Sequence, residues 1–222
     1  MTSEVIAIDG PSASGKSSTA AAVAKAIGAV HLDSGALYRG LARVSLELSD
    51  PDPRAVLRAA ESRGLELRAS GGEIVPYLDG NPAEAAIRTP AVTAAASVIA
   101  GQPSIREWVN ARLRAVARQG GRVVLDGRDI GTIVFPNAAV KIFLTASAGS
   151  RARRRLLQRG EAADPAALDR ETAALAARDA ADAARPIAPL RQAADAIVVD
   201  TTELAFQAQV EAIVGIVRQR LR

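Results

Sequence analysis

The sequence contains no cysteine and very few aromatic residues, and both absences limit what the chain can be. Without cysteine there is no disulfide and no thiolate metal site, which is compatible with a reducing compartment. Aromatic residues make up only 3% of a chain that is 49% hydrophobic. The core must therefore be built from alanine, valine, leucine and isoleucine.

Long hydrophobic runs are also missing. No apolar stretch approaches the roughly 18 residues that a membrane-spanning helix needs. Residues 1–9 enter a predicted strand without the basic segment and apolar run of a signal peptide. We therefore expect a cytoplasmic protein with no membrane partner.

Lysine is scarce among the basic residues. The chain has 28 Lys and Arg against 24 Asp and Glu, a net charge of +4, and its only lysines are Lys16, Lys25 and Lys141. The arginines lack the interleaved aromatic residues and the basic tail that are typical of nucleic-acid binding. We expect no nucleic-acid partner, and interpret the arginines as phosphate ligands together with ordinary solvated charges.

A complete phosphate-binding loop stands near the start of the chain. The apolar run Val5–Asp9 leads into Gly10–Ser17, which matches G-x-x-x-x-G-K-S, and Ser18–Ile27 has the pattern of a helix. This is the context that a P-loop requires. Successive backbone N–H groups surround the phosphates, Lys16 reaches the β- and γ-phosphates, and the Ser17 hydroxyl holds Mg²⁺. The predicted ATP-binding residues are Gly10, Pro11, Ser12, Ala13, Ser14, Gly15, Lys16, Ser17 and Ser18.

The rest of the chain alternates apolar strands with helices. Further strands are predicted at 29–32, 122–126, 140–144 and 196–200. This alternation indicates a parallel sheet covered by helices on both faces. Within 64–88, two apolar runs around Ser70-Gly71-Gly72 predict a small antiparallel excursion, in which Pro76 would mark an edge strand or a bulge.

Capping residues predict two helix starts. Ser104 and Glu107 have the spacing of a capping box, which would open a helix running toward Gln119. Thr202 follows the last predicted strand and is expected to cap the final helix.

A P-loop alone does not decide the activity, because its fold serves GTPases, kinases, motors and transporters. No Asn-Lys pair exists to form the guanine-reading element of a GTPase, and nothing indicates the partner of a motor or transporter. Three other segments are informative: LDSGALYR at 32–39, DGRDIGT at 126–132 and RDAADAARPIAPL at 178–190. Together with the P-loop, they resemble the bacterial cytidylate kinases of the nucleoside monophosphate kinase superfamily, from Val5 to the final helix.

The resemblance implies a fold and a reaction. The fold would be one P-loop α/β domain over 1–222, with an adenylate-kinase-like parallel sheet of about five strands in the order 2-3-1-4-5, flanked by helices. A small β-containing monophosphate-binding insertion would occupy about 34–105, and a short helical lid about 151–178. The reaction would be Mg²⁺-dependent phosphoryl transfer from ATP to CMP or dCMP, by a monomer whose partners are these small molecules.

The site for the acceptor phosphate can be argued partly from residue chemistry. Ser34 and Gly35 lie at a predicted helix N-terminus, which attracts anions, and Arg39 lies about one turn further along. Arg128 follows a parallel strand, at the rim where open α/β sheets bind ligands. The resemblance implies that Ser34, Arg39 and Arg128 hold the acceptor phosphate, with Tyr38 packed beside the nucleotide.

Cytosine presents an amino group and a ring nitrogen, so its reader needs an acceptor and a donor. The resemblance assigns Ser97 and Asp129 as acceptors and Arg106 as donor. An ion pair between Arg128 and Asp129 at a strand end is the structural alternative for that segment.

Arg178, Asp182 and Arg185 have a spacing that would place them on one face of a helix. On spacing alone an ordinary salt-bridged surface is the better interpretation. The resemblance instead implies ribose contacts for Arg178 and Asp182 and a phosphate contact for Arg185. Individually, Arg151, Arg153, Arg154 and Arg155 are expected to be solvated, although the family uses lid arginines at the transferring phosphate. The predicted catalytic residues are Lys16, Arg128, Arg154 and Arg185.

Such a kinase needs no covalent intermediate and no dedicated base, because the acceptor phosphate is already a nucleophile. Two other functions stay open. The chain could phosphorylate another small acceptor, such as UMP or AMP, or it could be a nucleotide-binding regulator or nucleic-acid binder without turnover.

Overall fold

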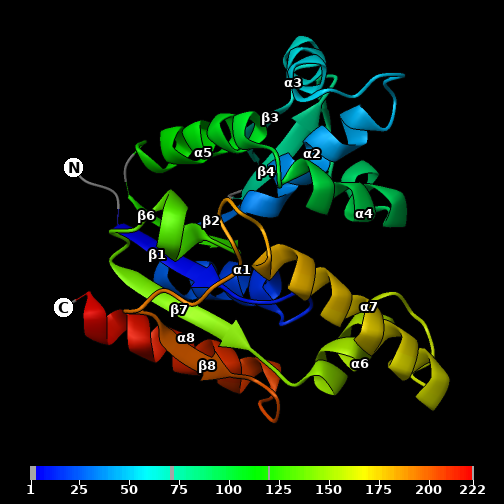
Figure 1. Cartoon of the computed structure of the whole chain (residues 1–222). Helices are drawn as coiled ribbons and strands as arrows, with labels where there is room; N and C mark the ends of the chain where they lie inside the picture. The colour runs from blue at the N-terminus through cyan, green and yellow to red at the C-terminus, as the bar shows by residue number, and fades with distance from the viewer. Residues whose placement is uncertain (1–3, 71–72, 120, 222) are drawn as a thin grey trace. The chain divides into compact units, whose positions relative to one another are not determined.

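The computed structural model describes residues 4–70, 73–119 and 121–221 (Figure 1). The predicted turn residues Gly71 and Gly72 lie outside these ranges. The strands are β1 (Glu4–Asp9), β2 (Val30–Asp33), β3 (Glu66–Ser70), β4 (Glu73–Leu78), β5 (Asn81–Pro82), β6 (Arg122–Gly127), β7 (Val140–Thr145) and β8 (Ile197–Asp200). The helices are α1 (Lys16–Ile27), α2 (Ser34–Ser45), α3 (Pro53–Ser62), α4 (Pro90–Ile99), α5 (Pro103–Ala117), α6 (Ala148–Gln158), α7 (Pro165–Ala183) and α8 (Phe206–Arg220), with short turns η1 (Ala86–Arg88) and η2 (Ile130–Val134).

The large sheet has five strands in the order β2-β6-β1-β7-β8. β1 pairs in parallel with β6, placing Ile6 opposite Val124, and with β7, placing Ile8 opposite Ile142. β8 pairs in parallel with β7. The expected order 2-3-1-4-5 counts the strands of this sheet alone. Counted along the whole chain the numbers differ, because β3, β4 and β5 form a separate sheet.

The chain forms two compact units. The first contains residues 30–121, and the second contains residues 4–29 and 122–222. In the second unit α1 and α8 pack against each other and against the sheet, and α6 packs against α7 (Figure 1). In the first unit α2 packs against α3, α4 and α5 and against β4 of the small sheet.

The core of the second unit is entirely aliphatic, as the shortage of aromatic residues predicts. Ile6 and Ile8 of β1 and Leu144 of β7 are fully buried against residues of α1 and α8 such as Val23 and Ile213. Fully burying one such side chain stabilises the fold by about 1.5–3 kcal/mol. Among the described residues no helix is both long and apolar enough to cross a membrane.

The antiparallel excursion is present as the sheet β3-β4-β5, but the expected place of Pro76 in it is wrong. Pro76 lies in β4, which is the middle strand and not an edge. The amide of Ala83 donates to the Pro76 carbonyl, and the reciprocal bond would need an N–H that proline lacks. A proline is tolerated in the middle strand because the two-residue ladder of β5 ends there.

Both predicted capping residues are wrong as helix starts. α5 begins at Pro103 after Gln102, because proline at the first helical position sets the backbone angle one residue before Ser104. α8 begins at Phe206 after Ala205. The Thr202 hydroxyl is engaged in the preceding loop, where it donates to Asp200 (2.6 Å) and accepts from the Ser147 amide (2.8 Å).

Asp9 ends β1 and ties it to the turn that follows β6. Its two carboxylate oxygens accept from the amides of Ile130 (2.8 Å) and Gly131 (2.7 Å). Burial raises the pKa of Asp9 to about 6; the two amides oppose this shift, and the nearby charge of Asp129 adds to it.

We predict that replacing Gly10 by alanine destabilises the protein by about 3 kcal/mol or more. Gly10 has φ 154°, and a Cβ atom built there would lie 2.1 Å from the carbonyl oxygen of Leu144. That oxygen belongs to the backbone of β7, so it cannot rotate away. Gly149 in α6 has open space around its Cβ position, so Gly149→Ala is the matched control. Urea unfolding measures both variants, and equal stabilities would contradict the prediction.

We predict that Asp9 titrates near pH 6 in the folded protein. Because its pKa is raised above the ordinary 3.8, the folded chain holds this proton more tightly than the unfolded chain. Its contribution to the unfolding free energy, about 3 kcal/mol, is complete below about pH 4 and lost as the pH rises through about 6. Carboxyl-carbon NMR, with Asp9→Asn for assignment, measures the midpoint.

Exposed Asp52 is the internal reference for this titration. It caps α3, and the amides of Ala55 and Arg54 hold its pKa below the ordinary value. The carbon signals of the two carboxyl groups should therefore report titrations in well-separated pH ranges. If Asp9 titrated together with Asp52, the raised pKa of the buried Asp9 carboxyl group would be refuted.

Candidate active site

The P-loop joins β1 to α1, and its backbone is turned as an anion site requires. Ala13 and Gly15 have positive φ angles of 58° and 88°. The helix begins at Lys16, two residues earlier than the predicted start at Ser18. The positive end of the helix dipole therefore lies within the loop itself.

Lys16 is buried, and its side chain folds back over the loop. Its Nζ donates to the carbonyl of Pro11 (2.6 Å) and to the hydroxyl of Ser14 (3.4 Å). Burial, and then the nearby charge of Arg128, lower the pKa of Lys16 well below its ordinary value. A bound polyphosphate would favour the charged form, because opposite charge raises the pKa of a lysine.

Ser17 lies against a carboxylate that our sequence analysis left without a role. The Ser17 hydroxyl donates to Asp126 Oδ2 (2.6 Å), and Asp126 is buried at the end of β6 beside β1. A sequence signal existed, since an acidic residue ending an apolar strand next to the P-loop strand is a common partner of nucleotide-bound Mg²⁺.

Arg128, Asp182 and Arg185 form one cluster next to the P-loop, in which two half-buried arginines flank a buried aspartate. Arg128 Nε donates to Asp182 Oδ2 (3.0 Å), Arg128 Nη2 donates to the Ser12 hydroxyl (3.0 Å), and Arg185 donates to the other oxygen of Asp182. The Asp182 side chain is only 3% exposed. Asp182 is therefore salt-bridged, as the spacing alone predicted for Arg185, but it is buried and also pairs with Arg128 from a distant segment. Arg178 lies on the same helix, α7, whereas Arg185 follows the end of that helix.

The arginines of α6 do not share one environment. Arg151 was expected to be solvated, but it is buried, and it donates to the Ser12 carbonyl (2.8 Å) and to Asp179 Oδ2 (2.5 Å). Arg154, the predicted catalytic arginine of this helix, donates to the hydroxyl (2.9 Å) and the carbonyl of Thr201, which follows β8. No sequence pattern pointed to a role for Asp179, and Arg151 was named only among the arginines expected to be solvated.

In the first unit, Asp33 organises the predicted phosphate-binding end of α2. One of its oxygens accepts from the Gly35 amide (2.8 Å), and the other pairs with Arg39 (2.6 Å) and Arg88 (3.2 Å). Burial alone would raise the pKa of Asp33, but the guanidinium groups of Arg39 and Arg88 outweigh it and hold the pKa below its ordinary value. Ser34 is the buried first residue of this helix.

Two of the residues predicted to read the cytosine edge, and the tyrosine predicted to pack beside the nucleotide, also lie in the first unit. Tyr38, Ser97 and Arg106 come from α2, α4 and α5. The buried guanidinium of Arg106 lies 5.5 Å from the centre of the Tyr38 ring and donates to the Ala100 carbonyl (3.1 Å). The fourth residue, Asp129, is buried in the second unit, where it directly precedes η2.

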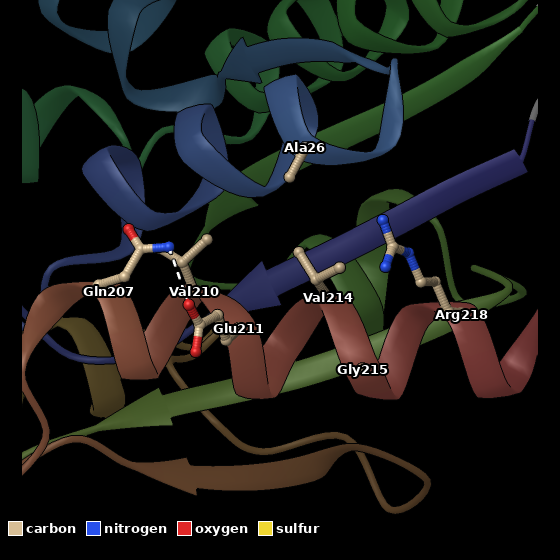
Figure 2. Close-up of a pocket in the computed structure, with 7 residues that line it drawn as sticks. All are labelled: Ala26, Gln207, Val210, Glu211, Val214, Gly215 and Arg218. Atoms are coloured by element: carbon tan, nitrogen blue, oxygen red, sulfur yellow. Dashed lines mark hydrogen bonds between the residues drawn. The ribbon is translucent and has the colours of Figure 1, made fainter.

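A groove of about 360 Å³ lies between α1 and α8, and Figure 2 shows its lining side chains. It includes none of the predicted site residues. Ala26, on its α1 side, lies at the opposite end of that helix from Lys16. The lining residues are Ala26, Gln207, Val210, Glu211, Val214, Gly215 and Arg218.

Comparison with known proteins gives a consistent assignment. The chain is 42% identical over 218 residues to a cytidylate kinase of Geobacillus sp. strain WCH70, covering 97% of both chains. It is 40% identical over 224 residues to a cytidylate kinase of Nocardia farcinica, covering 98% of this chain and 94% of that one.

The fold is also similar to that of a solved structure, TT1252 from Thermus thermophilus. That likeness has a TM-score of 0.50 at 19% sequence identity and covers 100% of each chain. The family model described as cytidylate kinase matches residues 6–219. From Ile6 to Gln219, therefore, this chain belongs to the cytidylate kinase family.

Proposed function

We propose that this chain transfers the γ-phosphoryl group of ATP to CMP or dCMP, giving ADP and CDP or dCDP. The observation that carries the proposal is the direct contact between the P-loop and the arginine cluster. Arg128 Nη2 lies 3.0 Å from the Ser12 hydroxyl, so a cation suited to the acceptor phosphate touches the loop suited to the donor. Membership of the cytidylate kinase family supports the choice of cytosine nucleotides.

Catalysis would be positioning and charge stabilisation. The P-loop, residues 10–18, would hold the ATP phosphates with its backbone amides. Lys16, Arg128 and Arg185 would stabilise the charge that develops on the transferring phosphoryl group, and Arg154 would join them from the lid. The acceptor phosphate attacks in line, so no side chain has to remove a proton.

Mg²⁺ fits the oxygen groups beside the P-loop. The Ser17 hydroxyl and the Asp126 carboxylate lie 2.6 Å apart, and one or two such ligands plus nucleotide phosphates suit this ion. Within the described part of the chain no cluster of three or more His, Cys, Asp or Glu side chains could hold a metal alone. When bound with ATP, Mg²⁺ would neutralise charge on the β- and γ-phosphates.

The predicted acceptor residues would each bind a different part of the nucleotide. Ser34, Arg39 and Arg128 would hold its phosphate, and Tyr38 would pack beside the nucleotide. Ser97, Asp129 and Arg106 would read the cytosine edge, and Arg178 and Asp182 would contact the ribose. Residues about 34–105 would form the monophosphate-binding part and about 151–178 the lid.

The proposed setting is pyrimidine nucleotide metabolism in the cytoplasm, with the enzyme acting as a monomer without a nucleic-acid partner. A kinase for another acceptor and a regulator without turnover are distinguished from this proposal by a panel of acceptors in a coupled ADP assay.

We predict that Lys16→Ala lowers kcat by about 10²-fold or more, because a preorganised cation at the transferring phosphate contributes several kcal/mol in the transition state. Lys25→Ala is the matched control, since Lys25 is an exposed lysine of the same helix. Steady-state assays on folded protein measure both. Near-normal turnover of the Lys16 variant would refute the proposed mechanism.

We predict that CMP and dCMP are good acceptors, that UMP is poor and that AMP and GMP are inert. UMP would set a carbonyl against the Asp129 carboxylate and an N–H against the Arg106 guanidinium. Such unpaired polar groups lower kcat/KM roughly 10²-fold or more, and purines would overfill the site.

The Asp129→Ala variant tests the base-reading assignment directly. It should reduce the preference for CMP over UMP more than it changes the affinity for ATP. Equal kcat/KM for CMP and UMP in the unmodified enzyme would overturn the base assignment while leaving a P-loop kinase.

A further inference from the structure

Ser12, the third residue of the P-loop motif, has all three of its polar groups engaged by residues distant in the sequence. Its amide donates to Asp179 Oδ1 (2.8 Å), its carbonyl accepts from Arg151 Nη1 (2.8 Å), and its hydroxyl accepts from Arg128 Nη2 (3.0 Å). The residue itself is 2% exposed. These three partners come from α7, from α6 and from the segment after β6.

Asp179 and Arg151 also bind each other, so that Ser12, Asp179 and Arg151 each contact the other two. Arg151 Nη1 lies 2.5 Å from Asp179 Oδ2, and Arg151 Nε donates to the Ala146 carbonyl (3.2 Å). Their side chains are 16% and 10% exposed. A buried ion pair with its hydrogen bonds satisfied has one preferred geometry, and losing one partner leaves a charge without compensation.

The helix held in this way carries the proposed acceptor residues. Asp179 directly follows Arg178, and Asp182 lies one turn further along α7. Asp182 in turn accepts a hydrogen bond from Arg128, and Arg128 also donates to the Ser12 hydroxyl. A change in the backbone of Ser12 therefore reaches the proposed ribose and phosphate ligands by two routes, through Asp179 and through Arg128.

We propose that Ser12 and Asp179 couple the two nucleotide sites, so that ATP and CMP each bind more tightly when the other is present. The P-loop conformation around the ATP phosphates would fix Ser12, and Ser12 would fix the orientation of α7. Asp179 is a positioning residue in this proposal, because it contacts the loop and Arg151 and acts on the acceptor through its helix. The inference rests on the proposed function.

Calorimetry tests the coupling. CMP binding is measured with and without a non-hydrolysable ATP analogue and Mg²⁺, and the reciprocal titration must give the same factor. We expect the analogue to increase CMP affinity by about 10-fold in the unmodified enzyme, within the usual range of such couplings. In Asp179→Asn the factor should fall to about 2-fold or less, while each separate affinity changes less than the coupling does.

Two further variants make the test decisive. Asp169→Asn removes an exposed aspartate of the same helix, and its coupling should equal that of the unmodified enzyme. Ser12→Ala removes only the hydroxyl bond to Arg128, and the coupling should also fall. This variant decides the question if the Asp179 variant does not fold.

The possible results are distinct. A coupling factor near 1 in the unmodified enzyme, or an unchanged factor in Asp179→Asn and Ser12→Ala, overturns the coupling proposal even if CMP is phosphorylated normally. Absence of CMP phosphorylation in the acceptor panel overturns the proposed function instead. A loss of coupling together with retained CMP phosphorylation supports both.

Discussion

Keeping buried charge compensated at the ends of β1 and β6 is the constraint on which the second unit depends. Asp9, Lys16, Asp126 and Asp129 are each no more than 6% exposed; the three aspartates lie on or just after these strands, and Lys16 begins the helix that follows the P-loop. Unpaired buried charges cost several kcal/mol, so the surrounding chain has to supply partners. Two backbone amides serve Asp9, and the Ser17 hydroxyl serves Asp126.

The same constraint explains why α6 and α7 have polar residues facing inward. Arg151 and Asp179 bring opposite charges to the P-loop, and Asp182 is held between Arg128 and Arg185. Each helix thus contributes to a network that is closed by hydrogen bonds and not by apolar contact. A network of this kind specifies geometry more than it adds stability, because the desolvation of its charges offsets most of their attraction.

Much of the fold was predictable because its signals are local and contiguous. The apolar strands, the P-loop, the end of its helix at Ile27 and the small antiparallel sheet all depend on neighbouring residues. The errors arose where two local signals competed. At Ser104 the adjacent Pro103 set the start of the helix instead of the capping pattern. The Thr202 hydroxyl bonds to Asp200 at the end of β8 and to the Ser147 amide before α6, and it does not cap a helix. Pro76 can lie in the middle strand because β5 is only two residues long and its ladder with β4 ends before Pro76, so no ladder bond needs the N–H that proline lacks.

The candidate site was predictable only where motifs are continuous in sequence. The P-loop and the segments around Arg39, Arg128 and Asp182 were named from patterns, and the structure places Arg128 and Asp182 together with the loop. Asp179 was given no role and Arg151 was expected to be solvated, because Asp179 meets Ser12 across 167 residues and no local pattern encodes that contact. The base-reading residues fall in two separate units, so their joint role stays a prediction.

The choice between lysine and arginine follows the geometry of each position. Arg128 and Arg151 each bind two or more groups through different nitrogens of one planar guanidinium, whose donors are spread more widely than those on the single nitrogen of a lysine. The proposed task of Lys16 is different: it would bring one compact charge past a tight backbone loop, for which a thin flexible side chain is suited. Burial, and then the charge of Arg128, lower the pKa of Lys16 although three nearby carboxylates oppose the shift. A bound polyphosphate would supply the opposite charge that favours the charged form of a lysine, so under the proposed function binding and charge stabilisation would coincide at Lys16.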